Sequence, residues 1–197
     1  MISLIMVILS PIIWGFMNVL DKTIVVHKVK NPLTYASIAG LINLILGIIL
    51  ASFLNWDNIS FSSLLFPAIA GVLLGGQFYL YYLILSKEDV SHIVGVIYMY
   101  PLIVALLSFL FLNEVLSFFG YIGMFLILVG VLMLSGRLRK LKLKTSLWMI
   151  ITMIFVVAFN EIFIKAATNN LAELNGIAIS SIFVGITILP VLFAKKI

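Results

Sequence analysis

Long apolar runs separated by short polar connections dominate the chain. Seven such runs are recognisable, at residues 3–26, 33–54, 64–85, 92–112, 118–135, 146–166 and 174–194. About 20 residues of α-helix are needed to cross the hydrocarbon core of a bilayer, which is about 30 Å thick. The pattern therefore predicts about seven spans joined by short loops, forming an all-α, polytopic transmembrane helix bundle. Strands are not expected, because the apolar runs do not alternate with polar residues.

Composition agrees with a membrane protein. Of the 197 residues, 64% are hydrophobic and only 10% are charged, too few to cover the surface of a soluble domain. The net charge of +5 is no sign of nucleic-acid binding, because five basic residues form one short run at 137–144 between two apolar stretches. We therefore expect the lipid bilayer as the main partner, no nucleic acid, and a multi-pass protein of the cell membrane.

The distribution of lysine and arginine predicts an orientation. Basic residues follow the first, third, fifth and seventh runs, whereas the loops after the second and fourth contain none. Cytoplasmic loops are enriched in lysine and arginine. This places the odd-numbered loops in the cytoplasm and the N-terminus outside.

Two segments of the chain repeat one another. SPIIWGFMNVLDK ends in Lys22 and IFVVAFNEIFIK ends in Lys165, an offset of 143 residues, and the same offset moves run 33–54 onto the last apolar run. The repeat unit then has five helices. We predict a complete unit at 1–135, a basic cytoplasmic loop at 136–145, and the first two helices of an incomplete second repeat at 146–197.

Several stretches resemble the EamA branch of the drug/metabolite transporter superfamily. They are W-G-x6-K in the first run, AGVLLGGQFYLYYLILSKEDVSHIVGVIYMYPLIVALLSFLFLNEVLS across the third and fourth, and GYIGMFLILVGVLML in the fifth. The fourth run also carries Pro101 and ends in a turn containing Leu112, Glu114, Leu116 and Ser117. The resemblance implies ten helices in two inverted five-helix repeats with a substrate cavity between them. It also implies that both termini are cytoplasmic, which conflicts with the orientation predicted from the lysines.

The first run carries four candidate substrate-pathway residues on one helix face. Asn18, Asp21 and Lys22 are three and four residues apart, and Trp14 lies one turn earlier. Ionised groups within lipid normally face the bundle interior or water. The alternative is that Asp21 and Lys22 only anchor the helix end by reaching the headgroups.

The sixth run contains a similar pair. Glu161 and Lys165 are four residues apart, in the order that favours an ion pair. They are either pathway residues or a structural ion pair without a transport role. If Lys22 and Lys165 both reach one cavity, they suit an anionic or zwitterionic substrate.

Further pathway candidates are uncharged. Asn43 and Gln77 are amides in apolar runs, where they either line a cavity or form hydrogen bonds between helices. Tyr98 and Tyr100 lie too deep in their run for an interfacial aromatic belt, so we also assign them to the cavity.

Small residues and one proline indicate how the helices pack. Gly71 with Gly75, and Gly120 with Gly123, would let helix backbones approach closely. Pro101 should interrupt its helix, and breaks at membrane depth often line cavities. Glu114 fits a cap at the start of the fifth helix.

The sequence does not favour catalysis or metal binding. It has no cysteine, its two histidines are far apart, and it contains no G-x4-G-K-[ST] or H-E-x-x-H motif. We therefore expect no enzyme, no metal and no cofactor.

Two functions remain open. The first is a secondary transporter of small metabolites or amino-acid-like solutes, with export as the expected direction, that works by alternating access between inverted repeats. The second is a partial or split transporter subunit, inactive alone, whose bundle is completed by a second chain or by missing C-terminal helices.

Overall fold

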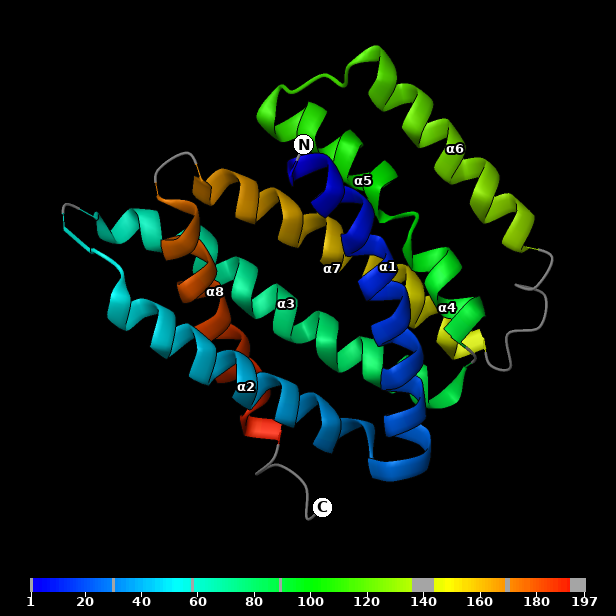
Figure 1. Ribbon diagram of the computed structural model, residues 1–197, viewed down its shortest axis with the longest axis horizontal. Helices are drawn as coiled ribbons and strands as arrows, with labels where there is room; N and C mark the ends of the chain where they lie inside the picture. Colours follow the sequence, from blue (N-terminus) through cyan, green and yellow to red (C-terminus); the bar gives the residue numbers. More distant parts are fainter. Residues whose placement is uncertain are drawn as a thin grey trace.

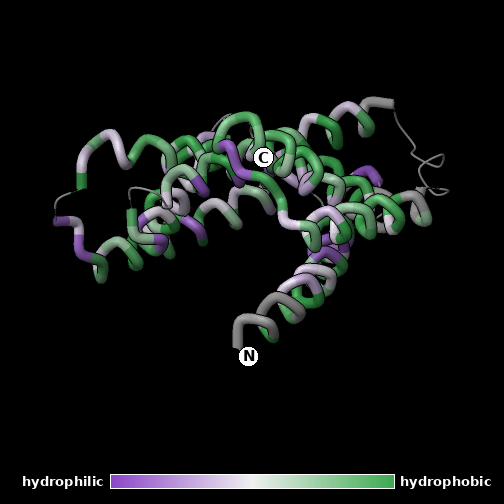
Figure 2. Tube along the Cα trace, turned by 90° about the horizontal axis from the view of Figure 1, so that it is seen from above, coloured by the Kyte–Doolittle hydropathy of each residue, from purple (hydrophilic) through white to green (hydrophobic). Residues whose placement is uncertain are grey.

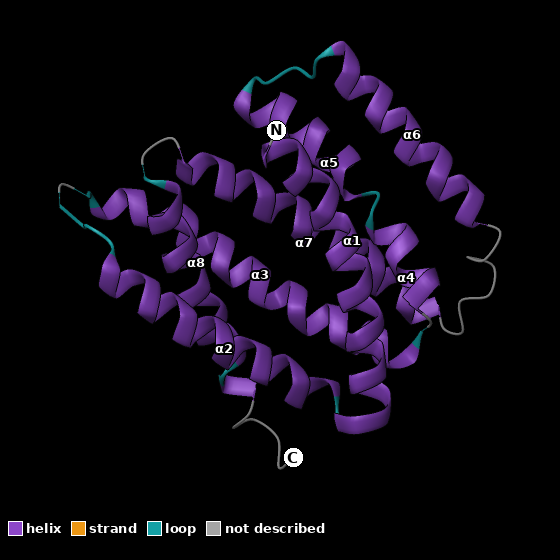
Figure 3. Ribbon diagram, in the orientation of Figure 1, coloured by secondary structure: helices purple, strands orange, loops and turns teal. Residues whose placement is uncertain are grey.

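The computed structural model describes residues 2–29, 31–57, 59–88, 90–135, 144–168 and 171–191. Within these residues the fold is entirely helical, as Figure 3 shows, which confirms the predicted class. The elements are α1 (Ile2–Thr23), η1 (Ile24–Val29), α2 (Pro32–Phe53), α3 (Phe61–Lys87), α4 (Val90–Ile97), α5 (Tyr100–Leu107), η2 (Ser108–Leu112), α6 (Phe118–Ser135), α7 (Lys144–Thr168) and α8 (Glu173–Ile188).

Within the described residues, each predicted apolar run corresponds to one helix or to consecutive helical segments. Among the described residues, five helical stretches are long and apolar enough to cross a bilayer, at 9–29, 32–53, 61–87, 95–112 and 147–168, and Phe118–Val131 and Glu173–Ile188 form shorter apolar helices. Residues 136–143 of the predicted basic loop lie outside the described residues, and α7 begins at Lys144.

The fourth run is split where the proline was expected to interrupt it. α4 ends at Ile97 and α5 begins at Tyr100, which places Pro101 in the first turn of α5. A proline is tolerated there because the first backbone N–H groups of a helix have no intrahelical acceptor. Two backbone hydrogen bonds between residues three apart span the break. The Met99 N–H donates to the Val96 carbonyl and the Leu102 N–H donates to the Met99 carbonyl, each over 3.0 Å.

Helix α3 is central to the arrangement. α2, α3, α7 and α5 follow one another across the view in Figure 1, and α3 contacts α2, α7 and α8. Ile84 and Leu85 of α3 and Ile150 of α7 are fully buried in the largest apolar cluster. Figure 2 shows that α1 leaves the layer formed by these helices, and α6 packs mainly against α4.

Glycines set the close approach of α8 to α2 and α3. A Cβ atom on Gly71 would run into the Ser180 carbonyl oxygen, and one on Gly75 would lie 2.9 Å from Thr187 Cβ. On the α2 side, a Cβ on Gly47 would lie 2.8 Å from the Ala178 carbonyl oxygen. These close approaches pack α8 tightly against both α2 and α3.

The second glycine pair does not form such a seam. A Cβ atom on Gly123 would have no neighbour within 4 Å, and one on Gly120 would meet only the Leu116 side chain just before the helix. Both glycines instead line a gap of about 400 Å³ beside α5 and η2. The prediction that they pack two helices together is therefore wrong, because α6 lies against α4 and turns this face toward the gap.

The outer surface of the bundle is apolar. Phe16, Phe125 and Trp148 are among many large hydrophobic side chains that are well exposed, Trp148 at 70%, and Figure 2 shows hydrophobic residues along most helices. Such a surface suits lipid rather than water. The chain is a multi-pass membrane protein.

Candidate functional site

A cavity of about 700 Å³ lies between α1, α3 and α7, with contributions from α2, α8 and the α4–α5 break. This volume is in the range of small-molecule sites. The structure brings together at this cavity all but two of the predicted pathway residues, namely Trp14, Asn18, Asp21, Asn43, Gln77, Tyr98, Tyr100 and Glu161. Lys22 and Lys165 do not line it.

The wall between α1 and α3 is held by an amide–hydroxyl contact. The Tyr81 hydroxyl donates a hydrogen bond to Asn18 Oδ1 over 2.7 Å, and the Asn18 side chain is 7% exposed. Both residues line the cavity. The bond fixes the amide's orientation and leaves its NH₂ group as a potential donor.

Asp21 lies one turn further along α1, where α2 approaches. Its Oδ1 accepts a 2.7 Å hydrogen bond from the Tyr35 hydroxyl, and the residue is 8% exposed. The Tyr35 ring packs edge-on against Tyr82, with ring centroids 4.7 Å apart. Aromatic packing therefore supports the hydroxyl that holds the carboxylate in place.

Lys22 points away from this cavity. Its ammonium group donates to the carbonyl oxygens of Leu85 and Glu88 over 2.6 and 2.7 Å, at the C-terminal end of α3. The last carbonyls of a helix lack intrahelical donors and carry partial negative charge, so a cation is stabilising there. The long side chain thus caps α3, and the expectation that this lysine faces the cavity is wrong.

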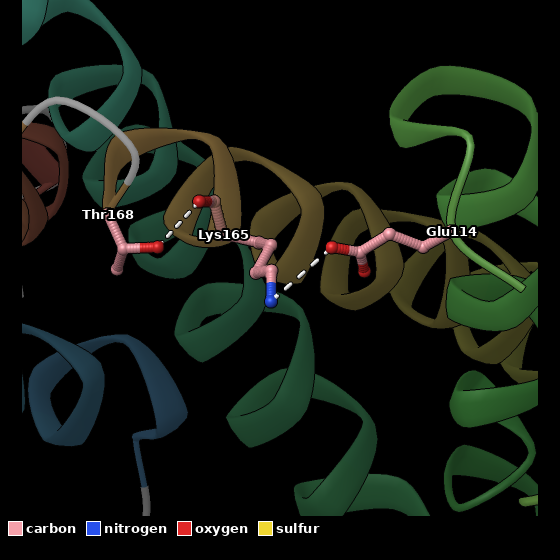
Figure 4. Close-up of polar contacts among 3 residues, drawn as sticks. All are labelled: Glu114, Lys165 and Thr168. Atoms are coloured by element: carbon pink, nitrogen blue, oxygen red, sulfur yellow. Dashed lines mark hydrogen bonds and ion pairs between the residues drawn. The ribbon is translucent and has the colours of Figure 1, made fainter. Parts of the chain in front are cut away.

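Lys165 also reaches elsewhere. Its Nζ lies 3.5 Å from Glu114 Oε1, as Figure 4 shows, and the two side chains are 54% and 51% exposed. Of the two alternatives left open by the sequence, the Glu161–Lys165 ion pair is not formed, because the flexible lysine side chain extends toward Glu114 in the loop before α6. Glu114 does not cap α6 either, since Ser117 Oγ accepts the Gly120 N–H over 3.3 Å.

The α7 wall carries a second amide. Asn160 Nδ2 donates to the Ala70 carbonyl of α3 over 3.2 Å, in a buried position. Its neighbour Glu161 lines the cavity with an exposed side chain and has no hydrogen-bond or ion-pair partner among the described residues. The carboxylate is consequently available to a solute.

Two predicted amides differ in their contacts. Asn43 Nδ2 donates within α2, to the Ala39 carbonyl over 2.9 Å, so this bond does not link helices. Gln77 is partly buried on α3 and faces the cavity.

The sequence reasoning missed Ser180 of α8, which lines the cavity and whose buried hydroxyl oxygen has no hydrogen-bond partner among the described residues. The pair of serines in the apolar SSIFVG segment was the available signal.

Most cavity-lining residues of α1 and α7 are related by the offset of 143 residues, whereas Pro11 and Asn160 line the cavity without a counterpart on the other helix. Ser10, Trp14, Asn18 and Asp21 line the cavity from α1, and the residues 143 positions later line it from α7. Those later residues are Met153, Val157, Glu161 and Ile164. The offset derived from the two lysines therefore also relates the faces of two helices across one cavity.

No three His, Asp or Glu residues in the described part of the chain are grouped to hold a metal ion. What the arrangement offers is a set of amides, hydroxyls, aromatic rings and two carboxylates around a solute-sized space within apolar helices. This combination defines a polytopic membrane protein with an open cavity whose mostly apolar lining carries several polar side chains.

The comparisons identify the family. The sequence model of the EamA-like transporter family matches residues 1–136, which is more than half of the chain, and the chain belongs to that family. No curated protein and no solved structure matches it. Members of this family are transporters rather than enzymes, so the chain is classed as a membrane transporter of small solutes.

Proposed function

We propose that the cavity between α1, α3 and α7 is the substrate site of a secondary transporter. The supporting observation is that polar side chains from separate helices converge on one space of about 700 Å³ inside an apolar bundle. Polar and ionisable groups at membrane depth are costly unless they serve a pathway or find partners. Glu161 has no partner within the described residues, which favours the first explanation.

Alternating access between the two repeats supplies the mechanism. The matching faces of α1 and α7 support two related halves around one site, as in transporters built from inverted repeats. The α4–α5 break, with Tyr98 and Tyr100 on the cavity, provides a place where backbone angles change without unwinding a continuous helix. In this mechanism the solute is a small metabolite or an amino-acid-like compound, and the direction is export.

A second candidate is a subunit that works only with a partner chain. α6 packs mainly against α4, and the gap of about 400 Å³ beside α5 and η2 is lined by Gly120 and Gly123. A helix from another chain would fill that gap and restore close packing. Mass measurement of the purified chain in lipid nanodiscs decides between the candidates: a monomer that transports supports the first, and activity confined to a dimer or heteromer supports the second.

The test of the site uses proteoliposomes and three radiolabelled aromatic solutes of different net charge. These are benzyltrimethylammonium, phenylalanine and phenylmethanesulfonate. Gln77→Leu should reduce uptake of any transported probe by about tenfold or more, because it replaces a cavity amide with an apolar group. Val72→Leu is the matched control, since Val72 lies on α3, exposed and away from the cavity.

Uptake at the same rate in both variants would contradict the assignment of this cavity. Reduced uptake in Gln77→Leu alone would support it, whatever the charge of the probe.

A further inference from the structure

The cavity has an unbalanced charge. Two carboxylates, Asp21 on α1 and Glu161 on α7, contribute to its lining, whereas none of the described residues lining it is a lysine, arginine or histidine. This inference rests on the proposed function, because it takes the cavity as the substrate site and asks which substrates fit its chemistry.

The neighbouring lysines do not neutralise these carboxylates. Lys22 follows Asp21 in the chain, but its ammonium group binds the α3 carbonyls of Leu85 and Glu88. Lys165 follows Glu161 by one turn, but it pairs with Glu114 outside the cavity. In both repeats the acid faces the cavity while the adjacent base is engaged elsewhere.

Neither acid forms a salt bridge with a positively charged side chain among the described residues. Asp21 accepts a hydrogen bond from the neutral Tyr35 hydroxyl, and it forms no ion pair with a described basic side chain. Glu161 has no polar partner among those residues. Removing a carboxylate from water is costly unless an opposite charge accompanies it, so a cationic solute would supply what the protein does not.

Aromatic rings complete the recognition of a cation. Trp14 of α1 and Tyr98 and Tyr100 at the α4–α5 break line the same space as the two acids. The faces of such rings attract ammonium groups, most strongly where water is excluded. Carboxylates and aromatic side chains that line one cavity form a combination that favours positive over negative charge.

We propose that the substrates are organic cations, specifically aromatic or alkyl ammonium compounds carrying one net positive charge. This reverses the expectation of an anionic substrate, which depended on both lysines reaching the cavity. Asp21 of α1 and Glu161 of α7 supply the counter-charges, and the aromatic residues supply the contact surface.

The experiment measures equilibrium binding to the full chain in nanodiscs of zwitterionic lipid, which carry no net charge to recruit the probes. Benzyltrimethylammonium should bind saturably, and phenylmethanesulfonate, of similar size and opposite charge, should not. Asp21→Asn and Glu161→Gln should each weaken binding of the cation by about tenfold or more, because each removes one of the two negative charges that line the cavity.

Matched controls change the same residue types away from the cavity. Asp57→Asn and Glu173→Gln alter exposed acids that do not line it, and they should leave the affinity unchanged. Thermal unfolding of all four variants shows whether each is folded. A folded Asp21→Asn or Glu161→Gln protein with wild-type affinity would overturn the proposal.

Failure of the charge preference is distinguishable from failure of the proposed function. If phenylalanine or the sulfonate is transported in a manner sensitive to Gln77→Leu while the cation neither binds nor moves, the cavity remains the substrate site and the cation proposal is overturned. If no probe responds to Gln77→Leu relative to Val72→Leu, the site assignment itself fails.

Discussion

Tyr81 of α3 and Asn18 of α1 are joined by a 2.7 Å hydrogen bond that crosses the wall of the cavity. α1 leaves the layer of the other helices, so each polar contact along its length matters for its position. The contact links a residue of the repeated segment SPIIWGFMNVLDK to the tyrosine-rich end of α3.

Tyr81→Phe removes this bond and leaves the nearly buried Asn18 amide oxygen without its donor. We expect the free energy of unfolding to fall by about 1–3 kcal/mol, the usual cost of an unsatisfied buried group. Thermal unfolding in detergent, followed by circular dichroism, measures the change. Tyr79→Phe, on the same helix and away from the cavity, is the control and should unfold like the wild type.

Lys22→Met removes the cation that caps α3. The Leu85 and Glu88 carbonyls lose a charged donor, and hydrogen bonds to charged groups contribute about 1.5–3 kcal/mol. We therefore expect a marked fall in the unfolding temperature. Lys165→Met should change it little, because exposed ion pairs such as that with Glu114 contribute at most about 1 kcal/mol. Equal stability of the two variants would argue against the capping role.

Gly71→Ala tests the seam between α3 and α8. The added Cβ would collide with the Ser180 carbonyl, a backbone atom that cannot rotate away, so the helices must separate. Overpacking of this kind costs about 1–3 kcal/mol. Gly76→Ala is the matched control on the same helix, because a Cβ there meets nothing within 4 Å. The unfolding temperature should fall in the first variant only.

Orientation is tested with single cysteines in a chain that has none. The basic run at 137–144 predicts that its loop is cytoplasmic. A cysteine at Ser146 should resist an impermeant maleimide in intact cells and react after permeabilisation. A cysteine at Asp57, in the lysine-free loop after α2, should react from outside. The reverse pattern would favour the orientation implied by the family resemblance.

The helices were predictable because length and hydrophobicity alone decide what crosses a bilayer. The break before α5 was predictable for a local reason, since Pro101 has no backbone N–H. Asn18 and Glu161 were identifiable as candidates because a polar group in an apolar run needs an explanation. Each of these inferences depends only on the residue types and their order in the chain, and not on which helices lie next to one another in the fold.

The lysines were less predictable. Spacing fixes the helix face on which Lys22 and Lys165 begin, but four flexible carbons carry each ammonium group to an acceptor in another element. Those acceptors, the α3 carbonyls and Glu114, are distant in sequence. The predicted packing of α6 was wrong for a similar reason. Gly120 and Gly123 permit a close contact with another helix but do not specify which helix makes it.

The position of α8 has a consequence for motion. α8 belongs to the second predicted repeat, yet it packs closely against α2 and α3 of the first at Gly47, Gly71 and Gly75. A rocking movement of the whole first repeat against the whole second repeat would have to break these close helix contacts. If the proposed transport movement takes place, we therefore expect α2, α3 and α8 to move as one body, so that the moving parts would not coincide with the two predicted repeats.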